Sequence, residues 1–154
     1  MTIKAMNHVG ISVADIDRSI AFYRDMLGMQ VVVRTSFEGD QYATILRLKG
    51  ASGRVALLRA AAMQIELFEF SCPVPRGGER DRPVCDHGIT HFCIEVHDID
   101  ATYRRLRDSG VVFHCEPLDF LGGARATYGR DPDGNVFELL EVREKRSGVG
   151  VHNG

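Results

Sequence analysis

The chain has 154 residues, 44% of them hydrophobic and 26% charged, with a formal net charge of -2 at pH 7. These totals suit one compact domain or two small modules, and they give no overall positive field that would attract nucleic acid or an anionic membrane. The sequence has no apolar run near the roughly 20 residues of a transmembrane helix and no signal-peptide core, so we expect a cytoplasmic protein without a nucleic-acid or membrane partner.

The first predicted elements are a strand and a helix. Residues 6–14 alternate between apolar side chains and small or polar ones, which is the period of a half-buried strand. The carboxylate of Asp15 is expected to cap the next helix, whose apolar residues recur at helical spacing. Gly28 is expected to end that helix.

Three further apolar stretches complete the first half, and we predict strands over 31–33, 42–48 and 63–70. Residues 54–58 fit either another strand or a loop. The first half, residues 1–70, therefore reads as a βαβββ module. Residues 71–88 contain three prolines and little apolar content, which predicts a linker or a long surface loop.

The second half repeats this order over 89–142. A strand over 91–96 is followed by a helix that Asp98 caps and Gly110 ends. Strands are predicted at 111–113, 124–128 and 136–142, and the last two are joined by a tight turn over 131–135. Residues 143–154, rich in glycine and charge, are expected to form a mobile tail.

The repetition extends to individual residues. When residues 8–25 are laid on 91–108, eight of the eighteen positions are identical. Both halves also close on a similar strand, 65–69 and 137–141, with glutamates at matching places. Such self-similarity indicates an internal duplication in which a histidine opens each copy and a glutamate closes it.

Pairing of the two halves would bring His8, Glu66, His91 and Glu138 together on strand faces that point away from the helices. Carboxylates this close raise each other's proton affinity, and a divalent cation removes that conflict. Nitrogen and oxygen ligands without a thiolate suit Zn, Ni, Co, Mn or Fe. Four protein ligands leave two octahedral positions for a bidentate substrate or two waters, which is typical of a catalytic site.

A single histidine or glutamate on a strand is more often structural or solvated than a ligand, and Glu69 and Glu141 recur as faithfully as the predicted ligands but on the opposite strand face. Arg47, Tyr128 and Arg125 fall on predicted strands and are candidate contacts for an anionic or carbonyl substrate. Cys93 shares a strand face with His91 and is a candidate lining residue.

The sequence resembles the vicinal oxygen chelate superfamily, the glyoxalase, bleomycin-resistance and extradiol dioxygenase group. The resemblance covers about residues 3–142 and is carried by His8-Val9-Gly10-Ile11-Ser12-Val13, residues 19–23, 27–29 and 88–92, the turn Asp131-Pro132-Asp133-Gly134-Asn135, and Phe137-Glu138-Leu139. Glyoxalase I-like and methylmalonyl-CoA epimerase-like members are most similar. The resemblance implies an α+β fold in which two paired βαβββ modules form a curved, cup-shaped mixed sheet with helices on the outside.

The resemblance also implies a metal site and a homodimer, in some members with a site shared across the interface. In glyoxalase I-like members the ligands match His8, Glu66, His91 and Glu138 position by position, whereas the epimerases commonly carry glutamine where this chain has Glu66. Extradiol dioxygenases use two histidines and one glutamate, so that Glu66 would be one carboxylate too many.

We therefore expect proton transfer next to a metal-chelated carbonyl, through an enediolate or enolate, in a lactoylglutathione lyase-like or acyl-CoA epimerase-like reaction on a small molecule with neighbouring oxygens. Glu66 or Glu138 would be the base, and the symmetry of the repeat does not choose between them. One alternative is an Fe(II) extradiol-type dioxygenase. The other is a small-molecule binding or antibiotic-resistance protein without turnover, which the cost of burying two carboxylates without a cation disfavours.

Overall fold

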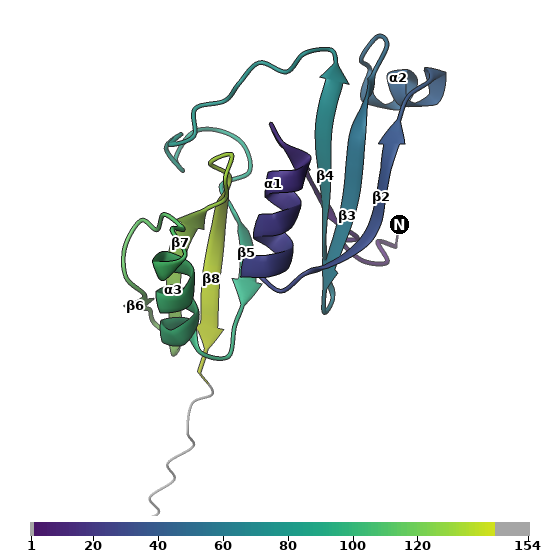
Figure 1. Cartoon of the computed structure of the whole chain (residues 1–154). Coiled ribbons are helices and arrows are strands. Elements are labelled where there is room, and N and C mark those ends of the chain that lie inside the picture. Colours follow the sequence, from purple (N-terminus) through teal and green to yellow (C-terminus); the bar gives the residue numbers. More distant parts are fainter. Residues whose placement is uncertain (1, 144–154) are drawn as a thin grey trace, which may run out of the picture. The chain divides into compact units, whose positions relative to one another are not determined.

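Two four-stranded mixed sheets make up most of the computed structural model, which describes residues 2–143 (Figure 1). The chain divides into a first unit, residues 1–82 with Pro132–Gly134, and a second unit, residues 83–131 with Asn135 onward. The tail predicted over 143–154 lies, apart from Arg143, outside the described residues.

The first unit contains one sheet, two α-helices and a π-helical segment. In the sheet the strand order is β1-β4-β3-β2, with β1 parallel to β4 and the other neighbours antiparallel. The elements are β1 (Val9–Ser12), α1 (Ile16–Ala21), η1 (Phe22–Met26), β2 (Gln30–Phe37), α2 (Asp40–Leu46), β3 (Ser52–Ala60) and β4 (Met63–Cys72).

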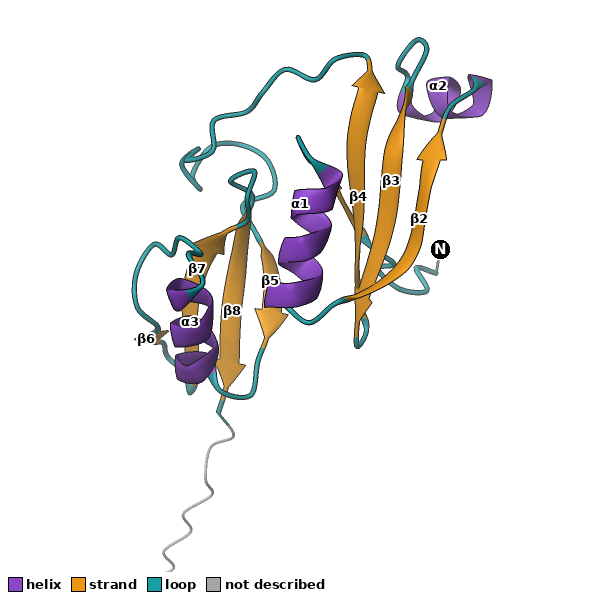
Figure 2. Ribbon diagram, viewed as in Figure 1, coloured by secondary structure: helices purple, strands orange, loops and turns teal. Residues whose placement is uncertain are grey.

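The second unit repeats this arrangement with shorter strands (Figure 2). Its strand order is β5-β8-β7-β6, again with one parallel pair, β5 with β8. The elements are β5 (Phe92–Glu95), α3 (Ile99–Asp108), β6 (Leu118–Asp119), β7 (Ala124–Arg130) and β8 (Val136–Val142). The predicted α+β class and the repeated βαβββ order are therefore confirmed.

Each sheet has a helix face, on which α1 or α3 packs, and an open face on its other side. Side chains alternate between the two faces along a strand. In β4, Ile65 and Leu67 are fully buried on the helix face, so Glu66 between them lies on the open face. In β8, Phe137 and Leu139 are likewise buried, and Glu138 lies between them.

The helices begin where the sequence predicts. Asp15 accepts hydrogen bonds from the backbone N–H groups of Asp17 and Arg18, and Asp98 accepts one from Ala101. These carboxylates satisfy N–H groups that have no partner within a helix. Both helices are therefore anchored at the same point of the repeat, directly after the strand that follows each repeated histidine.

The prediction of a strand over 42–48 is wrong, because this segment forms most of helix α2. Asp40 places a negative charge in the first turn of this helix, and Arg47 ends it in the left-handed conformation with φ 53°. Tyr42 and Leu46 are half-buried four residues apart, whereas Ile45 is 79% exposed, which is a helical pattern of burial. The strand between β2 and β4 in the sheet is instead β3. It contains residues 54–58, which by sequence fitted either a strand or a loop.

The predicted strand over 111–113 is also wrong as a regular element. Phe113 makes only an isolated bridge to Gly129, and the strand beside β7 is the two-residue β6. Pro117 lies between these two points of pairing and has no N–H group to donate to β7. The pairing is therefore interrupted where an uninterrupted strand was expected.

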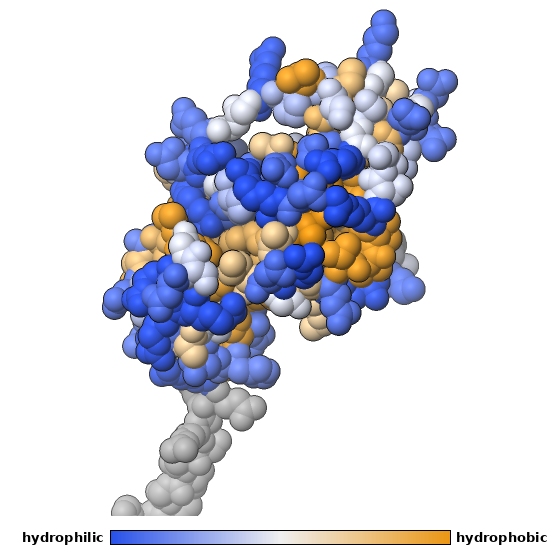
Figure 3. All heavy atoms as spheres, viewed as in Figure 1, coloured by the Kyte–Doolittle hydropathy of each residue, from blue (hydrophilic) through white to orange (hydrophobic). Residues whose placement is uncertain are grey.

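Apolar side chains gather on the surface over the lower part of β2 (Figure 3), where Val31, Val32 and Val33 are exposed. Isolated exposed apolar residues are normal, and three in a row on an edge strand are less so. Among residues 2–143, no helix is long and apolar enough to cross a membrane.

Candidate functional site

The first unit brings His8 and Glu66 together. His8 directly precedes β1, and Glu66 lies on β4, which pairs with β1 in parallel. The Nε2 atom of His8 is 3.3 Å from Oε2 of Glu66, and the two side chains are 40% and 29% exposed. The pair therefore lies on the open face of the sheet, within reach of a solute.

The second unit makes the same pair from His91 and Glu138. His91 directly precedes β5, and Glu138 lies on the parallel neighbour β8. Nε2 of His91 is 3.1 Å from Oε2 of Glu138, and the side chains are 26% and 17% exposed. The structure thus shows the predicted ligands as two pairs, one in each unit.

The other ring nitrogen of each histidine is held by the residue before it. Nδ1 of His8 is 2.8 Å from the amide oxygen of Asn7, and Nδ1 of His91 is 3.0 Å from the hydroxyl oxygen of Thr90. Sequence reasoning missed Asn7 and Thr90, although each is a residue with a side-chain oxygen directly before a repeated histidine. Such contacts fix the ring orientation of metal-binding histidines.

The contact with Asn7 has a consequence for Nε2 of His8. An amide oxygen only accepts, so Nδ1 of His8 must be the donor. In the neutral ring, Nε2 then presents a lone pair to the Glu66 carboxylate, and two electron-rich atoms face each other. A proton on Nε2 or a cation bound to both atoms relieves this repulsion, so the donor set fits a cation.

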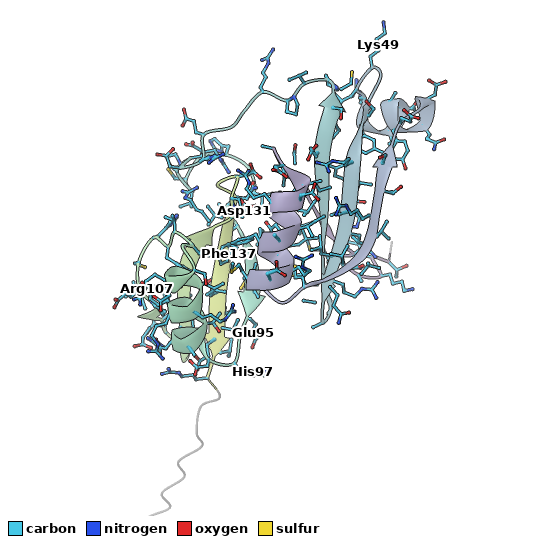
Figure 4. The ribbon with its side chains drawn as sticks, viewed as in Figure 1. Lys49, Glu95, His97, Arg107, Asp131 and Phe137 are labelled. Carbon is cyan, nitrogen blue, oxygen red and sulfur yellow. The ribbon has the colours of Figure 1, made fainter. Side chains whose placement is uncertain are left out.

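Each pair alone would supply two ligands. Among residues 2–143, no group of three or more His, Cys, Asp or Glu side chains is arranged to hold a metal ion. Elsewhere in the described range, His97 is exposed and follows Glu95 at the end of β5 (Figure 4). Imidazole nitrogen and carboxylate oxygen are ligands suited to a first-row transition metal.

Tyr128 lies beside the second pair, as the sequence suggested for a substrate contact. It is opposite Glu138 in the pairing of β7 with β8, and its ring centre is 4.7 Å from that of His91. Burial, followed by the charge of Glu138, raises the pKa of Tyr128 above its ordinary value, so its hydroxyl keeps its proton. A protonated phenol can donate to a carbonyl oxygen.

Cys93 completes the surroundings of Glu138. The two residues are paired in register on β5 and β8. Although Cys93 is an exposed residue, partial burial of its thiol, followed by the charge of Glu138, raises its pKa to about 12. The thiol therefore keeps its proton.

The structure does not bring the other two predicted substrate contacts to the His–Glu pair of their own unit. Arg125 lies on the helix face of β7, where it forms ion pairs with Asp100 on α3 and Asp119 on β6. Arg47 is on no strand; it ends α2 and is exposed. Of the three predicted contacts, Tyr128 alone lies beside the His–Glu pair of its own unit.

A family model and individual relatives point to the same protein family. Residues 5–139 match the model of the Glyoxalase/Bleomycin resistance protein/Dioxygenase superfamily. The chain is 33% identical to the lactoylglutathione lyase of Haemophilus influenzae, covering 93% of this chain and 96% of that protein. It is 31% identical to an ethylmalonyl-CoA/methylmalonyl-CoA epimerase of Cereibacter sphaeroides, covering 89% and 97%.

Solved structures agree with the fold. A glyoxalase family protein from Bacillus cereus superposes with a TM-score of 0.84 at 25% identity, over 92% of this chain and 95% of that one. The fosfomycin resistance protein FosX of Listeria monocytogenes, solved with Mn(II) and sulfate, superposes with a TM-score of 0.62 at 18% identity, over 91% and 93%.

Proposed function

Because the chain belongs to the Glyoxalase/Bleomycin resistance protein/Dioxygenase superfamily, we propose that it is a metal-dependent lyase or isomerase that moves a proton at a carbon next to a carbonyl group. Its substrate would be a small molecule with two neighbouring oxygens. The observation that carries this proposal is the repeated His–Glu pair, in which each histidine has its Nδ1 held and its Nε2 turned toward a carboxylate.

In this proposal His8, Glu66, His91 and Glu138 together hold one divalent cation, either within one chain or between two chains of a homodimer. Zn, Ni, Co, Mn and Fe all suit these ligands, and the presence of Mn(II) in the Listeria neighbour agrees with such a site. When bound, the cation would polarise the substrate carbonyl as a Lewis acid and so acidify the neighbouring C–H group.

The chain's own residues would then carry the proton. A glutamate, Glu66 or Glu138, accepts the proton from carbon through one carboxylate oxygen and returns it to the adjacent carbon or to the opposite face. Asn7 and Thr90 keep the two imidazoles oriented. The Tyr128 hydroxyl, beside His91, is placed to donate to a substrate oxygen.

Two of the relatives support two forms of this chemistry as candidate reactions. A lactoylglutathione lyase and an ethylmalonyl-CoA/methylmalonyl-CoA epimerase are both similar to the chain over most of its length. A lyase would return the proton to the adjacent carbon, and an epimerase would return it to the other face of the same carbon. We favour the lyase reaction because each His–Glu pair of this chain contains a carboxylate. The epimerases commonly carry glutamine where this chain has Glu66.

The test is to identify the cation that co-purifies with the protein by elemental analysis and then to assay the cation-loaded protein. Three probes separate the reactions: the hemithioacetal of methylglyoxal and glutathione, a 2-methyl-branched acyl-CoA, and a catechol with oxygen uptake measured. We expect turnover of one of the first two. Oxygen uptake with the catechol, or tight binding of a drug by a protein that takes up no cation, would overturn the proposal.

Matched variants tie any turnover to the pairs. Glu138→Gln should lower kcat by a factor of about 100 or more, because general-base catalysis and ligand charge are both lost. His97→Ala is the control, because His97 is an exposed histidine that makes no such pair. Full activity of Glu138→Gln with a normal cation content would contradict the assignment.

A further inference from the structure

The open face of the second sheet continues past Tyr128 to His114. Phe113 bridges Gly129 in antiparallel fashion, and the backbone N–H of His114 donates to the carbonyl oxygen of Tyr128 over 2.8 Å. Residues opposite each other in an antiparallel pair project from the same face of the sheet. Phe113 packs on the helix face, where its ring contacts that of Phe137, so His114 beside it projects from the open face.

Three rings therefore follow one another across this face. The ring centre of Tyr128 is 4.7 Å from that of His91, at an interplanar angle of 34°, and 6.0 Å from that of His114, at 72°. Both separations lie within the roughly 4.5–7 Å of favourable aromatic pairs. Because His91 also contacts Glu138, the row of rings extends from the proposed cation site to the exposed residue His114.

The imidazole of His114 is uncharged at neutral pH. Partial burial of the ring, followed by the charge of Arg130, lowers its pKa below the ordinary value of 6.5. An uncharged imidazole needs no anionic partner, and its ring can stack on another flat group. The first unit differs at the matching place, because the residue opposite Glu66 is the aliphatic Leu57 where the second unit has Tyr128.

We propose that His114 and Tyr128 form a subsite for a planar, uncharged group of the substrate, and that His114 is the residue that selects for it. The substrate would then be a compound whose two neighbouring oxygens are attached to an aromatic or other conjugated group. Its oxygens bind the cation, and its flat group lies against the rings. This inference rests on the proposed function, because the cation fixes the end of the substrate from which the flat group extends.

Three hydroxamates test this subsite without turnover. Benzohydroxamate, cyclohexanecarbohydroxamate and acetohydroxamate chelate a cation through the same two neighbouring oxygens, and they carry a planar ring, a saturated ring and a methyl group. The two rings are similar in size, so calorimetric Kd values for the cation-loaded protein separate ring stacking from burial of apolar area. We expect benzohydroxamate to bind about three to ten times more tightly than the cyclohexane analogue, the range for aromatic contacts beyond area burial.

Variants of His114 locate the preference. His114→Ala should lower the preference for the planar ring by about threefold or more. It should leave the Kd of acetohydroxamate unchanged, because the methyl group does not extend to the subsite. His114→Phe keeps a ring and should keep the preference. His97→Ala, which removes another exposed histidine of the second unit, is the matched control and should behave as the wild type.

The outcomes distinguish the subsite from the function on which it rests. A wild-type protein that takes up no cation, or that binds none of the three hydroxamates, would overturn the proposed function and the subsite with it. Equal Kd values for benzohydroxamate and the cyclohexane analogue, or an unchanged preference in His114→Ala, would overturn the subsite and leave the proposed function standing. Loss of the preference in His114→Phe as well as in His114→Ala would overturn the stacking role.

Discussion

The carboxylate of Glu69 accepts a hydrogen bond from the backbone N–H of Ile16, 2.7 Å away, and so ties strand β4 to the first residue of α1. Glu141 does the same for Ile99, the first residue of α3, at 3.0 Å. These glutamates lie on the helix faces, and their repetition has a structural cause. Glu66 and Glu138, three residues earlier, lie on the open faces, where no helix needs them.

Replacement of Glu69 by alanine should destabilise the protein by about 1–2 kcal/mol, because it leaves a helix N–H group without its acceptor and removes one of the two carboxylates to which a neighbouring arginine donates. That neighbour is Arg54, which donates to Glu69 over 3.2 and 2.6 Å. The free energy of unfolding in urea measures the effect. Glu38→Ala, at an exposed position, serves as the control. A Glu69→Ala variant that matches wild-type stability but loses cation binding would contradict the structural role.

Glu141 predicts a pH dependence. The Ile99 N–H group and then Arg143 hold the pKa of Glu141 below its ordinary value of 4.5. A carboxyl whose pKa is lower in the folded state adds stability above its unfolded pKa, and this contribution is lost as the pH falls through the folded pKa. Unfolding measured from pH 6 downward should therefore show a smaller loss of stability below pH 4.5 in Glu141→Gln than in the wild type. Parallel curves for the two proteins would contradict this.

Much of the architecture follows from local patterns. The repeat was predicted from three local patterns: alternation in the strands before Asp15 and Asp98, a capping carboxylate at each helix, and a final strand that carries glutamates. The structure contains both capped helices and both sheets. These features depend on neighbours in sequence and on side-chain period, which a sequence displays directly.

The sequence-based predictions that failed concern residues whose structure depends on tertiary packing. Residues 42–48 are apolar enough for a strand, but Tyr42 packs against Phe37 with ring centres 5.2 Å apart, and this contact exists only in the fold. Arg125 fits a substrate contact by type, yet the register of β7 turns it toward Asp100.

Phe37 should be a costly aromatic residue to remove from the first unit. It is 2% exposed and its ring meets those of Phe68 and Phe70 edge-on at 5.5 Å each. Phe37→Ala should cost about 3–5 kcal/mol through lost contacts and a cavity. Phe120→Ala, at a position 57% exposed, is the control and should change stability little. Equal midpoints of urea unfolding for the two variants would refute this account of the core.

A bound cation should stabilise the fold. A ligand that binds only the folded state, at about 100 times its Kd, adds roughly 2.7 kcal/mol to the unfolding free energy. Addition of Zn(II) to the cation-free protein should therefore raise its melting temperature, and a chelator should reverse the shift. His91→Ala should abolish the shift, whereas His97→Ala should retain it. A shift of equal size in His91→Ala would place the cation elsewhere.

The central claim is that both pairs hold the same cation, and the number of cations bound per chain tests it most directly. We expect one cation per chain by elemental analysis after dialysis, and loss of that cation in both His8→Ala and His91→Ala, since either pair alone leaves too few ligands. Two cations per wild-type chain, with one retained in each variant, would show that the pairs are separate sites and would contradict the account.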